Sequence, residues 1–104
     1  GRAMEMILTA KMVSAEEACN DGLVNQVTSQ EELMTSCKKA ALKMVKNSPR
    51  AIAAAIKTVN AGYTDGVNGF DMEIEEFGKC FGTADFQEGT RAFIEKRPAN
   101  FTGE

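Results

Sequence analysis

The sequence contains no histidine, no tryptophan and no run of eighteen apolar residues. Histidine is the usual general base and a common metal ligand near neutral pH, so its absence excludes Ser-His-Asp triads, Cys-His pairs and histidine-ligated metals. The lack of a long apolar run excludes a membrane-spanning helix within these residues. Most of the familiar designs for nucleophilic or metal-assisted catalysis are therefore missing from this chain.

Cysteine is also scarce. The three cysteines, Cys19, Cys37 and Cys80, are an odd number with no short spacing between them. This pattern favours reduced thiols over a disulfide framework or a zinc site. We therefore expect a cytoplasmic protein, with the mitochondrial matrix as the other compatible compartment. Each cysteine falls on an apolar helical position and is expected to be buried as a small hydrophobic side chain.

The charge balance narrows the range of partners. The 104 residues carry a net charge of −3, with 26% charged and 43% hydrophobic residues. A negative net charge argues against nucleic acid as a partner. The proportions are those of a globular chain and argue against disorder, and the length suits one domain or a piece of a larger one.

Helix start and stop signals dominate the sequence. Ser14 with Glu17 and Ser29 with Glu32 form capping-box patterns, and Pro49 follows a capping serine at the first helical position. Gly22 is suited to a left-handed helix end. We predict an all-α chain with about six helices and one short strand. The helices are expected over residues 2–8, 15–21, 29–46, 49–61, 65–81 and 85–97, and the strand over Leu23–Val27.

An apolar stripe runs along the fifth predicted helix at alternating spacings of three and four. Its members are Val67, Phe70, Ile74, Phe77 and Phe81. Such a stripe is typical of a core-facing helix and less often lines a cofactor pocket, and its regular spacing also resembles a helix–helix seam. With so few aromatic residues in the chain, these amphipathic helices are expected to need a partner surface.

The last predicted helix has both apolar and charged features. Asp85 and Glu88 form a helix-start signal, and Gly89 lies between Phe86 and Phe93 on one face. Glycine inside a helix costs about 1 kcal/mol relative to alanine, so we expect a close approach to the backbone there. Pro98 is expected to end the helix.

A cationic tip follows at Glu95-Lys96-Arg97. It has two interpretations, a solvated helix end or a grip for an anionic ligand.

No catalytic constellation emerges from the spacing of the remaining polar residues. Glu73, Glu75 and Glu76 are expected to form a solvated helix face, and no glycine-rich phosphate loop follows a strand. From the residues alone, the chain is interpreted as a helical accessory or assembly unit without catalytic or metal-binding residues.

An ordered set of short motifs adds a resemblance. Ala3-Met-Glu-Met-Ile-Leu-Thr9, Ala15-Glu-Glu-Ala18, Gly22-Leu-Val-Asn25, Ser48-Pro49, Lys57, Glu88-Gly89, Ala92-Phe93 and Glu95-Lys-Arg97 occur in this order. Together they closely resemble the C-terminal part of the enoyl-CoA hydratase (crotonase) family over essentially all 104 residues. Asn100-Phe101 fits its short-chain enoyl-CoA hydratases and 3-hydroxybutyryl-CoA dehydratases best.

The resemblance implies a fold and a reaction. The parent would have the α/β crotonase fold and would hydrate a 2-enoyl-CoA reversibly to a 3-hydroxyacyl-CoA, as in fatty acid metabolism, with no metal or cofactor beyond the CoA substrate. It implies that residues 1–28 are the tail of a spiral core domain and residues 29–104 a helical trimerisation region, assembling as trimers or dimers of trimers. The two catalytic glutamates and the oxyanion hole of the family have no counterpart here, so the chain is expected to be a C-terminal fragment that is inactive alone.

The resemblance also implies one binding role. By the match to Ala92-Phe-Ile-Glu-Lys96, Phe93 would pack against the CoA of a neighbouring subunit and Lys96 would contact its adenosine-phosphate end. An ammonium group suits a phosphate as a compact point charge. Arg97 is a less certain neighbour, and core packing is the alternative role for Phe93.

One position departs from the family pattern, because Ala10 stands where the family usually has glycine. If its φ is positive, alanine would strain the turn by about 1 kcal/mol. Two other functions stay open. The chain could be a free-standing helical interaction module without affinity for CoA, or the same part of an enoyl-CoA isomerase.

Overall fold

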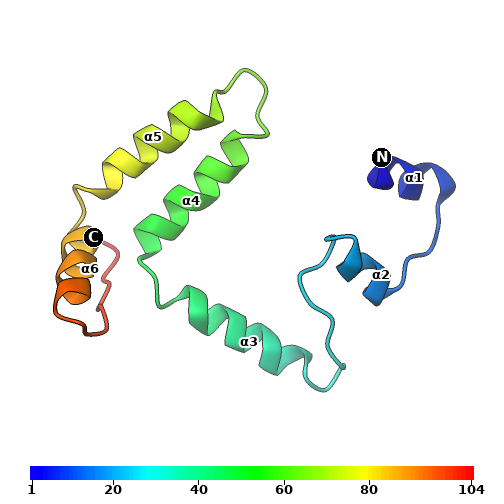
Figure 1. Ribbon diagram of the computed structural model, residues 1–104, viewed down its shortest axis with the longest axis horizontal. Helices are drawn as coiled ribbons and strands as arrows, with labels where there is room; N and C mark the ends of the chain where they lie inside the picture. The colour runs from blue at the N-terminus through cyan, green and yellow to red at the C-terminus, as the bar shows by residue number, and fades with distance from the viewer. The chain divides into compact units, whose positions relative to one another are not determined.

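Six α-helices follow one another in a computed structural model that describes residues 1–104 (Figure 1). They are α1 (Arg2–Thr9), α2 (Ala15–Asn20), α3 (Leu33–Met44), α4 (Pro49–Ala61), α5 (Gly69–Cys80) and α6 (Ala84–Ile94). Contacts divide the chain into two units, residues 1–37 and 38–104, with α3 running across the division. The all-α prediction with six helices is confirmed, and each unit is described by itself.

The start and end of α2 follow the predicted local chemistry. The Ser14 hydroxyl accepts from the Glu17 N–H, and the Glu17 carboxylate accepts from the Ser14 N–H, which completes the capping box. Gly22 has a φ of 75° and ends the helix. The next residue, Leu23, donates its N–H to the Ala18 carbonyl at 2.8 Å, which is the hydrogen bond that defines a Schellman motif.

The predicted strand over Leu23–Val27 is wrong. These residues form bends and irregular backbone, and the Leu23 and Val24 amides both donate to the Ala18 carbonyl. A strand needs its amides for a neighbouring strand, whereas here the helix end uses two of them. The apolar run therefore reflects the helix C-terminal motif rather than a sheet.

The end of α1 contains the strained position suggested by the family pattern. Ala10 has a φ of 49° and a ψ of 31°, in the left-handed region that favours glycine. The Thr9 hydroxyl donates to the Glu5 carbonyl at 2.6 Å and closes the last turn of the helix. The conditional expectation of strain at Ala10 is thus met.

The third helix begins later than predicted. Ser29 accepts from the Glu32 N–H, but the residues between them form a turn, and α3 starts at Leu33. The expected burial of the cysteines is also wrong, since Cys37 on this helix is exposed and Cys19 and Cys80 are only half-buried. All three are free thiols in the structure.

The α4 and α5 helices lie side by side as a hairpin (Figure 1). Ser48 caps α4 by accepting from the Ala51 N–H, with Pro49 at the first helical position as predicted. At the closed end, a Cβ atom on Gly69 would lie 3.0 Å from the Gly62 Cα, so the two backbones meet through glycines. Lys57 and Glu76 form an ion pair of 2.7 Å across the hairpin.

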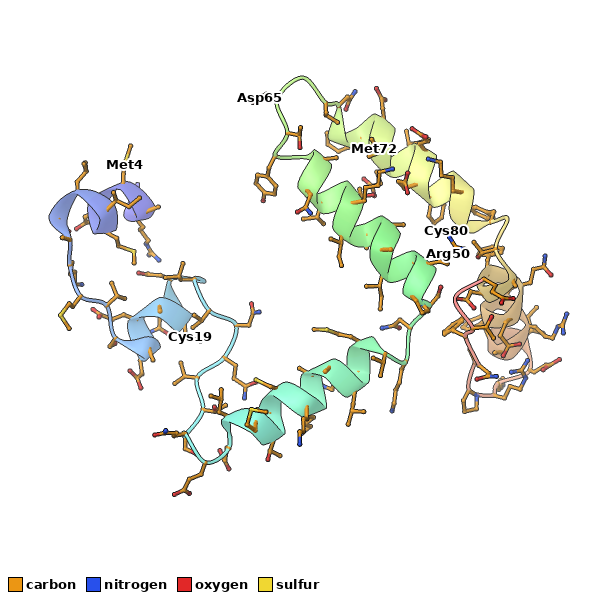
Figure 2. All side chains as sticks on the ribbon, turned by 180° about the vertical axis from the view of Figure 1, so that it is seen from behind. Met4, Cys19, Arg50, Asp65, Met72 and Cys80 are labelled. Atoms are coloured by element: carbon orange, nitrogen blue, oxygen red, sulfur yellow. The ribbon has the colours of Figure 1, made fainter.

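The predicted start of α5 near Asp65 is wrong. The helix begins at Gly69, where the Asn68 side chain accepts from the Phe70 N–H. Asp65 lies in the loop between α4 and α5, as Figure 2 shows. Gly66 in that loop has a φ of 75°, which a helix does not accommodate.

The sixth helix is capped by Thr83, not by Asp85 as predicted. The Thr83 hydroxyl accepts from the Phe86 N–H at 3.1 Å. An aromatic row joins the preceding helix to this one, with ring centroids 5.0 Å apart for Phe77 and Phe81 and 4.5 Å apart for Phe81 and Phe86. The C-terminal residues fold back along α6 (Figure 1).

Few large side chains are buried by the chain itself. The buried apolar residues are Ala18, Ala61 and Ala92. The stripe on α5 is exposed, with exposed fractions of 79% for Phe70, 71% for Ile74 and 64% for Phe77. The core interpretation of this stripe is therefore wrong for the chain alone, because α4 covers only the side of α5 that carries Glu76. None of the helices is long and apolar enough to cross a membrane.

Candidate functional site

The end of α6 and the residues after it form the candidate site. The Arg97 N–H donates to the Ala92 carbonyl at 3.0 Å, and the Lys96 N–H donates to the Phe93 carbonyl at 3.3 Å. These two bonds make a second Schellman motif. Lys96 occupies its left-handed position with a φ of 53°. The cationic segment therefore lies just beyond the helix, which ends at Ile94.

Lys96 is an unusual residue at such a position. Glycine is the common choice there, and a side chain costs about 1 kcal/mol. The Lys96 side chain is exposed, and its ammonium group has no ion-pair partner in the chain. The turn therefore exposes an unpaired cation at a left-handed backbone position.

Phe93 lies in the last turn of α6, and its side chain is 85% exposed. It is joined to Lys96 by the backbone bond of the turn. The side chain is not packed in the interior of the chain, which excludes core packing within the chain as its role. An exposed ring and an unpaired ammonium group at the same helix end suit a ligand that has both an apolar and an anionic part.

A mainly apolar groove runs past Phe93. It is lined by residues of α6, the C-terminal segment, the end of α5 and the start of α4, among them Ser48, Cys80, Phe86, Gly89, Phe93 and Phe101. Gly89 forms its floor, where a Cβ atom would lie 3.2 Å from the Phe101 ring. The predicted close approach at Gly89 is confirmed, and Phe101 is the group that approaches.

Glu88 clamps the turn that follows α6. Its carboxylate accepts from the Arg97 guanidinium at 2.6 and 2.9 Å and from the Asn100 N–H at 2.9 Å. The hydrogen bonds from Arg97, and then the one from Asn100, lower the pKa of Glu88 to about 2. Arg97 also pairs with Glu95 at 2.6 Å, and these two carboxylates raise its pKa.

Asp85 anchors the end of the chain. It is 2% exposed, and its carboxylate accepts from the Ser48 hydroxyl at 2.6 Å and from the Thr102 and Gly103 N–H groups at 2.8 and 3.1 Å. The Ser48 hydrogen bond is the main cause of the lowered pKa of Asp85. Arg50, labelled in Figure 2, donates to the Gly103 carbonyl at 2.8 Å. Burial of this carboxylate is therefore matched by hydrogen bonds.

Asp85 and Glu88 were predicted to cap the start of α6 as a helix-start signal, and in the structure they bind other amides instead. Each accepts from otherwise unpaired amides, as that signal requires, but the amides belong to residues 12 to 18 positions later. Sequence reasoning missed both anchoring roles, because no local spacing reveals a partner so far along the chain.

The comparisons with known proteins decide the family. The enoyl-CoA hydratase/isomerase family model matches residues 1–104. The chain belongs to the enoyl-CoA hydratase/isomerase family.

Several relatives of this chain are named as hydratases. A crotonyl-CoA hydratase of Syntrophomonas wolfei is 39% identical over 102 residues, which cover 97% of this chain and 39% of the relative. A mitochondrial enoyl-CoA hydratase of Pongo abelii is 39% identical over 100 residues, covering 95% of this chain and 34% of the relative. The chain therefore spans less than half the length of the curated relatives it matches.

Solved structures agree on the fold. The crystal structure of an enoyl-CoA hydratase from Bacillus anthracis matches all of this chain and 41% of its own, with a TM-score of 0.92 and 35% identity. The predicted placement of the helices within a crotonase-type fold is confirmed by this match.

The next question is which side chains could serve as acid–base groups or metal ligands. Glu76 lies between Lys57 and Lys79, at 2.7 and 2.8 Å, and these hydrogen bonds lower its pKa. A carboxylate held by two cations is a poor general base at neutral pH. No group of three Asp, Glu or Cys side chains is arranged to hold a metal ion.

Proposed function

We propose that this chain is the assembly and CoA-contacting part of an enoyl-CoA hydratase. The reaction is the reversible hydration of a 2-enoyl-CoA to a 3-hydroxyacyl-CoA, with the CoA thioester as substrate and no separate cofactor. Membership of the hydratase/isomerase family and the similarity to a crotonyl-CoA hydratase support this proposal. The names of the relatives favour hydration over isomerisation.

The observation that carries the proposal is the pairing of Phe93 and Lys96. Phe93 carries an 85% exposed ring and Lys96 an unpaired ammonium group, and a backbone hydrogen bond joins the two residues in a left-handed turn. Strained backbone positions cluster at binding and active sites. In the proposed role, the Lys96 ammonium binds the adenosine-phosphate end of CoA, and the Phe93 ring packs against the CoA moiety. Arg97 is not assigned a contact, because Glu88 and Glu95 already occupy its guanidinium group.

The groups that perform the hydration lie outside these 104 residues in this proposal. Glu17 completes a helix cap and Glu88 clamps a turn. Glu73 and Glu76 line one groove between α4 and α5, but Glu76 is paired there with Lys57 and Lys79. Residues 1–28 are assigned to the catalytic core domain and residues 29–104 to a region that self-associates. The exposed apolar stripe on α5 supports that self-association.

A chimeric enzyme tests the assembly role. This chain replaces the matching segment of the crotonyl-CoA hydratase of Syntrophomonas wolfei, to which it is 39% identical. We expect the chimera to hydrate crotonyl-CoA, whereas the 104 residues alone remain at the background rate. Turnover by the isolated chain would contradict the assignment of the catalytic groups. A folded chimera without turnover would contradict the assembly role.

Replacing Lys96 tests the binding role. In the full-length enzyme, Lys96→Ala is expected to raise the KM for crotonyl-CoA about tenfold, a loss typical of one charge-assisted contact, with a much smaller change in kcat. The KM for crotonyl-pantetheine, which lacks the nucleotide, should stay the same. Lys39→Ala, at an exposed lysine of α3, is the matched control. An unchanged KM for crotonyl-CoA in Lys96→Ala would overturn the assignment.

The exposed helix faces also suit a second function, a helical interaction module without affinity for CoA. Equilibrium binding of CoA to the full-length protein separates the two functions, since a pure interaction module should not bind it. The cytoplasmic location stays a prediction, because the named relatives include a mitochondrial enzyme.

A further inference from the structure

One carboxylate, that of Glu88, holds the residues that follow Lys96. Glu88, one and a half turns before the end of α6, accepts from the Arg97 guanidinium at 2.6 and 2.9 Å. It also accepts from the Asn100 N–H at 2.9 Å. Lys96 lies just before the first of these anchoring points, and the whole segment from 96 to 100 is tied back onto the helix.

The clamp opposes the strain in the turn. A lysine with a φ of 53° would relax toward negative φ if the following residues were free to move. The bidentate contact with Arg97 restricts that movement, because a guanidinium–carboxylate pair fixes orientation as well as distance. The Glu88 side chain is 23% exposed, so water screens this pair less than a fully exposed one.

The clamp also makes the two neighbouring cations different, because it pairs one of them and not the other. Arg97 is engaged by Glu88 and Glu95, whereas Lys96 has no carboxylate partner. Without Glu88, the guanidinium group would lose its main partner and the backbone of the turn would lose the Asn100 contact. The turn that carries the Lys96 ammonium group would then be held by its two backbone hydrogen bonds alone.

We infer that Glu88 is a positioning residue for the phosphate-bearing end of the CoA thioester, acting through Arg97 and Asn100 on the Lys96 turn. This inference rests on the proposed function, in which Lys96 contacts that end of the substrate. Glu88 itself does not touch the ligand in this role. Its effect is to keep the ammonium group in a binding-competent geometry before the ligand arrives, which lowers the entropic cost of binding.

A double-mutant cycle in the full-length enzyme tests the inference. The measured quantity is kcat/KM for crotonyl-CoA divided by kcat/KM for crotonyl-pantetheine, so that a general loss of folding cancels. We expect Glu88→Gln to lower this ratio about fivefold and Lys96→Ala to lower it about tenfold. In the Lys96→Ala background, Glu88→Gln should have no further effect, because both act through the same contact.

Two further variants complete the test. Arg97→Lys keeps the charge but loses the bidentate geometry, and it should lower the ratio as Glu88→Gln does. Glu76→Gln removes a carboxylate that is also paired with two cations but lies on α5, and it is the matched control. If Glu88→Gln fails to fold, Arg97→Lys alone decides.

The outcomes separate the inference from the proposed function. Additive effects of Glu88→Gln and Lys96→Ala would overturn the positioning role, as would a ratio unchanged by both Glu88→Gln and Arg97→Lys. A ratio unchanged by Lys96→Ala would instead overturn the CoA contact itself. An effect of Glu88→Gln that disappears in the Lys96→Ala background would support both.

Discussion

Two residues other than glycine, Ala10 and Lys96, have a left-handed backbone conformation at a helix end. Their side chains differ in what they contribute. Ala10 ends α1 with a φ of 49°, and its methyl group performs no visible task. Ala10→Gly should therefore raise the free energy of unfolding by about 1 kcal/mol, measured by urea denaturation. Ala53→Gly, at an exposed position in the interior of α4, is the opposite control and should lower it by about 1 kcal/mol. A destabilising Ala10→Gly would contradict the strain.

Lys96 shares this strain but carries the proposed binding role. Lys96→Gly should stabilise the fold by about 1 kcal/mol, while Lys96→Ala should leave stability nearly unchanged, because alanine is strained there as well. Both variants should raise the KM for crotonyl-CoA to the same extent. Thermal unfolding and steady-state kinetics on the two proteins measure these effects. If glycine were no more stable than alanine, the left-handed turn would not be a cost to the fold.

At the scale of elements, α6 and the C-terminal segment form one unit through two carboxylates. The pKa of Glu88 falls from 4.5 to about 2 because Arg97 and Asn100 donate to its charged form. A lowered pKa means that the contribution to stability is full above about pH 4.5 and is lost as the pH falls toward 2. The stability difference between wild type and Glu88→Gln should be constant from pH 5 to 8 and shrink below pH 4.5. A difference that grows in acid would contradict the clamp.

Sequence patterns predicted the elements where the chemistry is local. The Ser14 and Ser48 caps and the Gly22 helix end depend on residues within a few positions, and all three are confirmed. The strand after Gly22 was wrong because the helix end uses its amides. The predicted start of α6 was wrong because the Asp85 carboxylate does not cap the helix. It accepts hydrogen bonds from Ser48 and from C-terminal amides, between 17 and 37 positions away. No spacing rule contains such partners.

At the scale of the whole molecule, the sequence correctly indicated more apolar surface than the chain can cover. The interior is built from alanines, while the large side chains of α5 remain exposed. The 3-4 spacing of the stripe was interpreted as core or as a helix–helix seam, and one chain could not distinguish the two, since burial depends on what lies opposite. The exposed fractions show that the α4–α5 hairpin does not cover the stripe by itself.

Ile74 offers a direct test of that cover. It is 71% exposed in the middle of the stripe, so Ile74→Glu should change the stability of the lone hairpin by less than about 0.5 kcal/mol. If copies of the protein bury the stripe against each other, the same change removes about 1.5–3 kcal/mol of apolar burial per site. The dissociation constant of the assembly should then rise at least about tenfold. Sedimentation or light scattering across a dilution series measures this, with Glu75→Gln on the neighbouring exposed position as the control. Equal assembly of wild type and Ile74→Glu would show that the stripe is not the self-association surface, and would leave α5 facing another part of the same protein.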